Sequence, residues 1–202
     1  MQFRNTALAT TFMLLGAGSF GAHAAFENLL VDNSTLATAQ AVGPFSNDGV
    51  INVFGLRGTI DVFGTLIVDN HNADYYSFDI TGPRTITLRV DTPDGPFLGD
   101  DPVVGLFSPE GIQLINDDDG GPGFDSLLSF TVSASGTYFA AVSGFNDFDF
   151  DGVADSSGNA STDWPYTLQI SAADPAPVPV PAAGWLLGSA LLGLVARKRA
   201  KT

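Results

Sequence analysis

Short runs of apolar and β-branched residues, separated by polar turns, repeat along the middle of this chain. The run at 85–90 alternates strictly between polar and apolar positions, which is typical of a strand with one wet face and one buried face. Glycine, proline, asparagine, aspartate and serine fill the gaps between runs, as they do in turns. The pattern predicts nine strands, at 50–56, 59–68, 75–80, 85–90, 103–107, 112–115, 127–132, 137–142 and 166–170.

Helical periodicity is confined to the two ends of the chain, apart from one short turn of helix expected at 35–42. Many short strands with frequent turn signals favour two packed sheets over a single open one. We therefore expect an all-β, jelly-roll-like β-sandwich of about eight to nine strands. An N-terminal signal helix and a C-terminal transmembrane helix complete the predicted architecture.

The N-terminus follows the plan of a secretory signal peptide. Arg4 precedes a largely apolar stretch, and small residues surround His23 at its end. A charged, then apolar, then small-residue order is what signal peptidase recognises. We expect residues 1–24 to be removed by cleavage after Ala24, which would export the remainder of the chain.

The C-terminus has the order of a membrane anchor. A proline-rich spacer at 175–181 precedes an uncharged apolar segment at 182–196, and the basic tail 197–202 contains Arg197, Lys198 and Arg199. The apolar segment is short, since a span needs roughly 20 apolar residues. Basic residues beside an apolar helix favour the cytoplasmic side. One interpretation is a plain anchor in the inner membrane that leaves residues 25–174 outside.

The same tail resembles a bacterial sorting signal of the PEP-CTERM class, in its VPLPA variant. The resemblance rests on Val178, Pro179, Val180, Pro181 and Ala182, followed by Trp185 and the arginine-rich end. It implies an exosortase-type enzyme that cuts near Pro181, a transient stay in the inner membrane of a Gram-negative bacterium, and release into a surface layer or matrix rich in exopolysaccharide.

Residues 25–174 are long enough for one domain with a hydrophobic core. This stretch holds all 22 acidic residues against three arginines, a formal charge of −19. Such a charge opposes nucleic acid as a partner, since phosphate binding needs clustered Lys and Arg. The chain has no cysteine, so disulfides and thiol chemistry are excluded. Metal ions are the partners that the charge favours.

Six segments recur here in the order that they have in one family. They look like the bacterial pre-peptidase C-terminal (PPC) domain, a β-sandwich appended to secreted proteases and other exported proteins. The resemblance covers most of residues 32–173 and implies calcium binding, surface attachment or adhesion rather than catalysis. The segments are 36–42, 73–80, 86–90, 101–120, 125–145 and 166–171.

A long acidic insertion at 145–165 departs from that family, in which the last two strands are joined by a tight turn. Its DxDxDGxxD pattern places alternating carboxylates around a glycine, and Ca²⁺ takes six to eight such hard oxygen ligands. A backbone carbonyl and water or Asp163 would complete the shell, at a dissociation constant on the order of 10⁻⁴ to 10⁻³ M. The predicted ligands are Asp147, Asp149, Asp151, Val153 and Asp155. Alternatively, the phenylalanines of this loop pack inward while its aspartates merely face solvent.

A second acidic cluster lies at 117–125. It predicts either another calcium site, with Asp117, Asp119 and Asp125 as ligands, or a turn in which aspartates bond their own backbone. Both interpretations stay open.

Catalytic signals are weak. His71 would be the sole histidine after signal removal, and no nucleophile or metalloprotease motif is present. The sequence favours a non-enzymatic surface or matrix protein. A calcium-dependent carbohydrate-binding module is the alternative, with Trp164, Tyr75, Tyr76 and Phe148 either stacking on sugars or filling the core. A secreted hydrolase is the third interpretation.

Overall fold

The structure is a computed structural model, which describes residues 23–29, 31–45, 48–62, 66–70, 73–93, 100–154 and 163–177. These residues form strands alone: β1 (His23–Phe26), β2 (Gln40–Phe45), β3 (Gly49–Val62), β4 (Leu66–Asn70), β5 (Asp74–Ile80), β6 (Arg84–Asp91), β7 (Pro102–Phe107), β8 (Gln113–Asp117), β9 (Ser126–Val132), β10 (Gly136–Gly144) and β11 (Trp164–Ala173).

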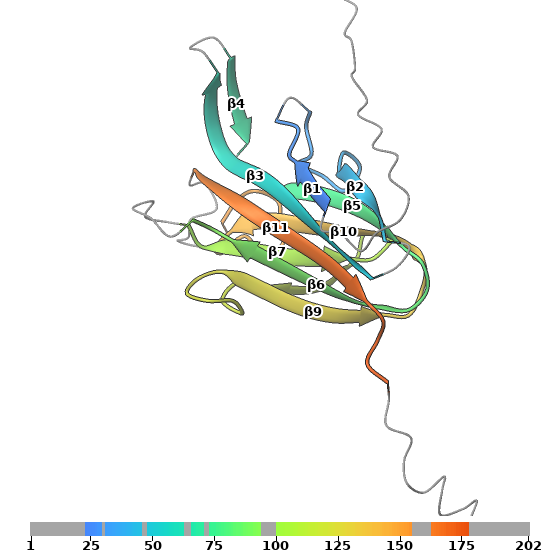
Figure 1. Cartoon of the computed structure of the whole chain (residues 1–202). Coiled ribbons are helices and arrows are strands. Elements are labelled where there is room, and N and C mark those ends of the chain that lie inside the picture. The colour runs from blue at the N-terminus through green and yellow to red at the C-terminus, as the bar shows by residue number, and fades with distance from the viewer. Residues whose placement is uncertain are drawn as a thin grey trace, which may run out of the picture.

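The strands form two sheets that pack face to face (Figure 1). Sheet 1 has the order β1-β3-β11-β6-β9, with β4 hydrogen-bonded to the far end of β3. Sheet 2 has the order β2-β5-β10-β7-β8. The prediction of an all-β protein with two layers is confirmed. Both sheets are mixed, because β1 pairs with β3 and β2 pairs with β5 in parallel, which differs from the antiparallel arrangement of a jelly roll.

Each of the nine predicted segments contains a strand, but two boundaries differ. The segments 50–56 and 59–68 form one long strand, β3, followed by the hairpin partner β4. Of the helical turn expected at 35–42, residues 35–38 form a single hydrogen-bonded turn, in which Thr38 N donates to the Thr35 carbonyl at 3.1 Å, and residues 40–42 belong to β2 instead. Gly43 has a φ of 126° and Pro44 follows it, so this segment suits an irregular edge strand better than a helix.

The predicted terminal helices lie outside the described residues, as do the sorting motif and the basic tail. Within the described residues, no helix is long and apolar enough to cross a membrane. The expected cleavage site after Ala24 falls inside β1. Two hydrogen bonds hold the chain just after this point. Gln40 Nε2 donates to the Phe26 carbonyl at 2.9 Å, and Glu27 N donates to the Phe54 carbonyl at 2.9 Å.

The main core lies between the sheets and includes side chains from both, such as Leu88, Leu106 and Leu168. A second, smaller core covers the outer face of sheet 2. Phe107 and Ala141 of that sheet pack there with Phe150 from the acidic loop. This part of sheet 2 is therefore covered on both faces, and all six residues of β7 are buried. The outer face of sheet 1 has no such cover among the described residues.

The two ends of the sandwich differ in charge. We call the end where β6, β8 and β10 finish the acidic end. Strand register places its loops side by side, since Val104 pairs with Asp117, Gly144 with Pro102, and Val90 with Ser126. The described acidic residues gathered there are Asp74, Asp91, Asp100, Asp101, Asp117, Asp118, Asp119, Asp125, Asp147, Asp149, Asp151 and Asp163.

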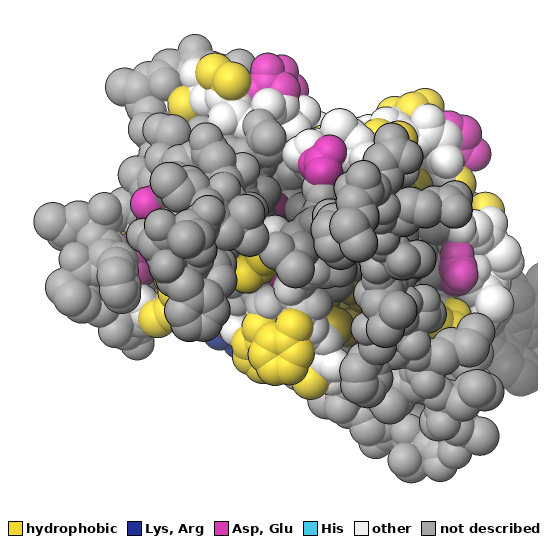
Figure 2. All heavy atoms as spheres, turned by 90° about the horizontal axis from the view of Figure 1, so that it is seen from above, with side chains coloured by type: hydrophobic (Ala, Val, Ile, Leu, Met, Phe, Trp, Pro, Cys, Tyr) yellow, Lys and Arg dark blue, Asp and Glu magenta, His cyan; other side chains and the backbone are white. Residues whose placement is uncertain are grey.

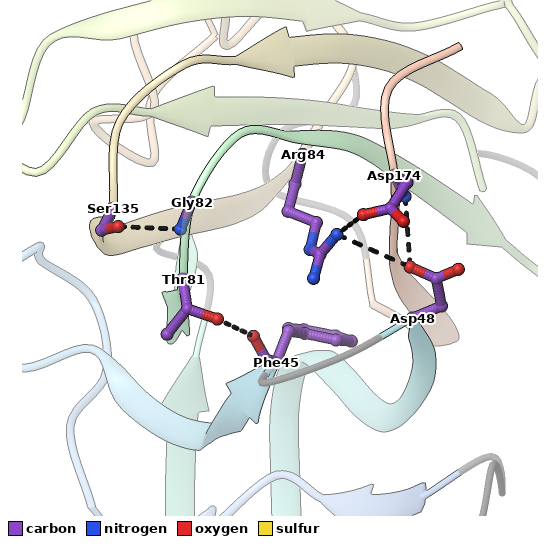
Figure 3. A network of polar contacts seen from close by, with 7 residues as sticks. All are labelled: Phe45, Asp48, Thr81, Gly82, Arg84, Ser135 and Asp174. Carbon is purple, nitrogen blue, oxygen red and sulfur yellow. Dashed lines mark hydrogen bonds and ion pairs between the residues drawn. The ribbon is translucent and has the colours of Figure 1, made fainter. Parts of the chain in front are cut away.

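The opposite end, which we call the Arg84 end, is closed by a guanidinium group (Figure 3). Arg84 forms ion pairs with Asp174 and, at 3.8 Å, with Asp48, and Asp174 N also donates to Asp48 at 3.1 Å. These contacts join the start of β3, the start of β6 and the segment after β11. Across the face drawn in Figure 2, acidic side chains recur while basic ones are barely visible.

Candidate metal site at the acidic end

The acidic loop begins with a tight turn directly after β10. Asp147 N donates to the Gly144 carbonyl at 3.1 Å, and Phe145 N donates to the Asp101 carbonyl at 2.8 Å. Asn146 lies between them with a φ of 69°, in the left-handed region that asparagine tolerates better than most residues. The turn directs Asp147 back toward the end of sheet 2.

Asp147 is fully buried and serves as the acceptor that closes this loop. Its carboxylate accepts hydrogen bonds from the Ser143 hydroxyl, from Asp151 N at 3.0 Å and from Gly152 N at 2.9 Å. Burial raises the pKa of Asp147, these donors oppose the shift, and neighbouring Asp149 adds to it. One aspartate therefore holds the loop closed while its charge remains only partly compensated.

Asp147, Asp149 and Asp151 each place a carboxylate oxygen within 4.8 Å of the other two. Asp149 and Asp151 are exposed, so water or an ion can reach the group from solvent. Three converging carboxylates supply hard oxygen ligands of the kind that Ca²⁺ prefers. The sequence-predicted residues with this alternating spacing thus meet in space. Asp155 lies outside the described residues.

Phe150 positions the loop from beneath. Its side chain is 2% exposed, its φ is 60°, and its ring lies 5.5 Å from that of Phe107 in an edge-on contact. A Cβ at Gly105 would lie 2.6 Å from the Phe150 ring, so glycine is required at that position. The Tyr75 hydroxyl donates to the Phe150 carbonyl at 3.1 Å. The inward packing of phenylalanine and the convergence of the aspartates are consequences of one loop conformation.

The field of the three carboxylates reaches into the second core. Burial raises the pKa of Tyr75 to about 12, and the charges of Asp147, Asp149 and Asp151 add to the shift. The negative charge of the loop thus disfavours ionisation of the neighbouring Tyr75 hydroxyl.

Two predicted ligands of the second cluster, Asp117 and Asp125, accept hydrogen bonds from backbone N–H and hydroxyl groups instead. Asp117 accepts hydrogen bonds from Gly120 N and Leu127 N, both at 2.8 Å. Asp125 accepts from Thr92 N at 3.0 Å and from its hydroxyl at 3.2 Å. Among the described residues, Asp117, Asp119 and Asp125 do not converge as the first group does. This is the geometry of the turn interpretation.

Asp101 sits between the two acidic loops. Burial raises its pKa to about 6, and the charges of Asp119, Asp118 and Asp100 act in the same direction. The Oδ1 atom of Asp101 is buried without a hydrogen-bond partner among the described residues. Burial and the negative charges gathered at this end therefore disfavour the ionised form of Asp101.

Sequence reasoning missed a buried polar network beside the loop. The Tyr76 and Tyr166 hydroxyls lie 2.6 Å apart, and Tyr166 donates to Asp74 at 2.7 Å. Glu27 accepts hydrogen bonds from Leu56 N at 2.8 Å and from Asn33 at 3.3 Å. These residues are distant in sequence and share no motif, so no local signal could have found them.

Arg57 lies fully buried beside this network, with its guanidinium 5.4 Å from the centre of the Trp164 ring. Burial lowers its pKa, and the charges of Asp74, Asp147 and Glu27 oppose that shift. The guanidinium thus provides counter-charge for buried acids of both the network and the loop.

The aromatic residues considered for sugar binding are not on the surface. Trp164, Tyr76 and Tyr75 are 1%, 0% and 6% exposed, and Phe148 packs against the second core. The core interpretation is confirmed for Trp164, Tyr75 and Tyr76, while Phe148 is half-buried. His71 lies outside the described residues.

Comparison with known proteins bears on the domain that carries this site. Residues 72–144 match the family model described as the bacterial pre-peptidase C-terminal domain. The resemblance expected from the sequence is confirmed over that range, which ends where the acidic loop begins. The sorting signal stays a prediction. No curated protein matches the chain in sequence.

Two solved structures are similar to this chain. One is the pre-peptidase C-terminal domain of a collagenase from Bacillus anthracis, at 15% identity and a TM-score of 0.35, covering 66% of this chain and 93% of that one. The other is PliG of Aeromonas hydrophila, a periplasmic inhibitor of g-type lysozyme, at 14% identity and a TM-score of 0.38, covering 66% and 98%. Both scores are low.

Proposed function

We propose that this chain is an exported, non-enzymatic bacterial surface or matrix protein whose acidic loop is stabilised by Ca²⁺. The observation that carries the calcium proposal is the convergence of Asp147, Asp149 and Asp151 within 4.8 Å on a loop that buried Phe150 holds in place. Export is supported by the signal-peptide pattern and by the PPC match, since that domain is expected in exported proteins.

The tail would serve for sorting. In this proposal an exosortase-type enzyme cuts near Pro181 after the apolar segment has held the chain in the inner membrane. The last described strand ends at the Arg84 end, where Asp174 pairs with Arg84. The acidic end therefore lies at the far end of the sandwich from the start of the tail (Figure 1). A loss of mass that matches cleavage near Pro181, measured on the chain isolated from its own cells, would support this processing; an intact tail would contradict it.

A thermal melt of the full chain in detergent, with Ca²⁺ titrated against EDTA, tests the metal site. A ligand that binds only the folded state raises stability by mass action, by about 1.4 to 2.7 kcal/mol at roughly 10 mM Ca²⁺ if the dissociation constant is on the order of 10⁻⁴ to 10⁻³ M. The double variant Asp149→Asn with Asp151→Asn should lose this gain. A matched control, Asp118→Asn with Asp119→Asn, removes the same charge from the other loop and should keep it.

The outcomes separate a site from general charge screening. Equal loss of the calcium effect in both double variants would mean that Ca²⁺ acts on the field of the whole acidic end. No effect of Ca²⁺ on the unaltered chain would reject the metal site and leave a solvated acidic loop.

A further inference from the structure

The outer face of sheet 1 is a broad polar surface with little charge. Strand register aligns outward-facing residues into rows across the sheet. The central row consists of Asn52, Gln169, Arg89 and Leu127 on β3, β11, β6 and β9. The inward-facing positions between these rows, such as Leu88 and Ile170, belong to the main core. The face is thus built on a rigid, fully packed support.

Hydroxyl and amide groups recur along these rows, beside the Leu127 side chain, which is 39% exposed. Gln169 Nε2 donates to Asn52 Oδ1 at 3.2 Å, and Thr87 donates to Ser129 at 3.2 Å. The Thr85 and Thr131 hydroxyls lie 3.0 Å apart in the next row. Each of these groups retains further donor or acceptor capacity. The face therefore offers a grid of neutral hydrogen-bonding groups.

Two phenylalanine rings stand exposed at the margin of this grid. Phe26 on β1 and Phe54 on β3 are 75% and 43% exposed, and their ring centres lie 5.4 Å apart. They share a row with Thr167 and, at its far side, Asp91. Exposed aromatic rings beside neutral polar groups suit a partner that has both hydroxyls and apolar C–H faces.

Among the side chains of this face that the structure describes, charge is confined to one pair. Arg89 Nη2 lies 2.5 Å from Asp91 Oδ1, so the described rows carry no net charge, whereas residues 25–174 carry −19. An anionic polymer would meet one guanidinium that is already paired, and repulsion from the rest of the domain. An uncharged partner avoids both penalties.

We propose that the outer face of sheet 1 binds an uncharged polysaccharide, with the Phe26 and Phe54 rings stacked on sugar faces and the hydroxyl and amide rows bonded to sugar hydroxyls. The inference rests on the proposed matrix role, because it names the partner that would hold the domain there. It does not involve the acidic loop, so binding is independent of Ca²⁺.

A second copy of this chain fits the face less well. The centre of a protein interface is usually apolar or aromatic, with anchoring side chains that fill pockets. Here the rows hold mainly hydroxyls and amides, and the exposed Phe26 and Phe54 rings lie at the margin. Two domains of strong negative charge would also repel each other on approach.

Affinity electrophoresis of the full chain tests the proposal, in a polyoxyethylene detergent that carries no sugar. The gels contain dextran, amylose or mixed-linkage β-glucan as neutral probes and alginate as the anionic one, each with EDTA and with Ca²⁺. We expect retardation by at least one neutral probe under both conditions. Phe54→Ala should weaken binding roughly tenfold, since an aromatic contact contributes on that order, and Phe54→Tyr should restore it. Phe124→Ala is the matched control, because Phe124 is 65% exposed on a loop of the acidic end.

Retardation that is lost in Phe54→Ala and kept in Phe124→Ala supports the proposal. Binding by no neutral probe, equal loss in both variants, or retardation by alginate alone overturns it. Binding that EDTA abolishes while Phe54→Ala leaves it intact also overturns it, and would place the sugar at the acidic loop. Failure of the calcium melt leaves this result untouched, so the two proposals fail separately.

Discussion

The two ends of the sandwich compensate aspartate charge in different ways. At the Arg84 end, one guanidinium joins Asp48 and Asp174, which are 54% and 77% exposed. At the acidic end, Asp117, Asp125 and Asp147 are held by backbone N–H groups and hydroxyls. Such donors fix a loop in place without cancelling its net charge. The acidic end is therefore ordered and still strongly negative, and protons, a buried arginine or a metal ion must lower its field.

The largest effect should come from replacing the arginine at each end, which is Arg57 at the acidic end and Arg84 at the Arg84 end. Arg57→Met leaves Asp74, Glu27 and Asp147 buried without their counter-charge, which should cost about 3 to 5 kcal/mol of unfolding free energy. Arg84→Met loses contacts to exposed carboxylates, worth about 0.2 to 1 kcal/mol. Urea unfolding of the full chain in EDTA, followed by tryptophan fluorescence, measures both.

Arg57→Lys serves as the control for this comparison. It keeps a positive charge but not the planar group over Trp164, so its loss should lie between those of the two methionine variants. If Arg57→Met and Arg84→Met lost equal stability, the buried guanidinium would not be the counter-charge of the acidic end.

A smaller effect should separate the structural role of the acidic loop from its metal role. Asp147→Ala leaves the Ser143 hydroxyl and the N–H groups of Asp151 and Gly152 without their acceptor, at a cost of about 2 to 3 kcal/mol in EDTA. Asp149→Asn should leave stability in EDTA nearly unchanged and reduce only the gain from Ca²⁺. Calcium melts of both variants measure the difference, and equal stability of the two in EDTA would refute a closing role for Asp147.

The strands could be predicted from the sequence because alternation is a local signal. The sandwich needs inward residues at every second position, and β6 shows this plainly with Ile86, Leu88 and Val90. β1 and β2 were missed because short parallel edge strands lack such a run. Neither strand pairs with the next strand along the chain: β1 pairs with β3, and β2 pairs with β5.

The two acidic clusters show what the spacing of residues in the sequence cannot predict. In sequence, the aspartates at 117–125 and at 147–151 are both candidates for calcium, and the spacing favours the latter. Only the aspartates at 147–151 converge, because Phe150 packs against Gly105 and the Ser143 hydroxyl donates to Asp147. At 117–125, Thr92 from another loop donates to Asp125. Partners that come from separate strands decide the outcome, and spacing does not reveal them.

The smallest effect concerns protons at the acidic end. The pKa of Asp101 is raised to about 6 by burial and by the charges of Asp119, Asp118 and Asp100, against about 3.9 for a free aspartate. Between these values the folded state holds a proton that the unfolded state has released. The stabilisation from Asp101 is therefore full below about pH 4 and is lost as the pH rises through about 6.

Asp101→Asn removes this dependence because the amide stays neutral at every pH. In EDTA at pH 7 the variant should be more stable than the unaltered chain, by about 1 kcal/mol after allowance for solvent screening. At pH 4 the two should differ little, since Asp101 is then largely protonated, which makes the low-pH melt an internal control. Urea unfolding at both pH values checks the prediction. A variant that is less stable at pH 7 would mean that the Asp101 carboxylate is held by a favourable contact, and that the field of the acidic end is already neutralised there without a metal ion.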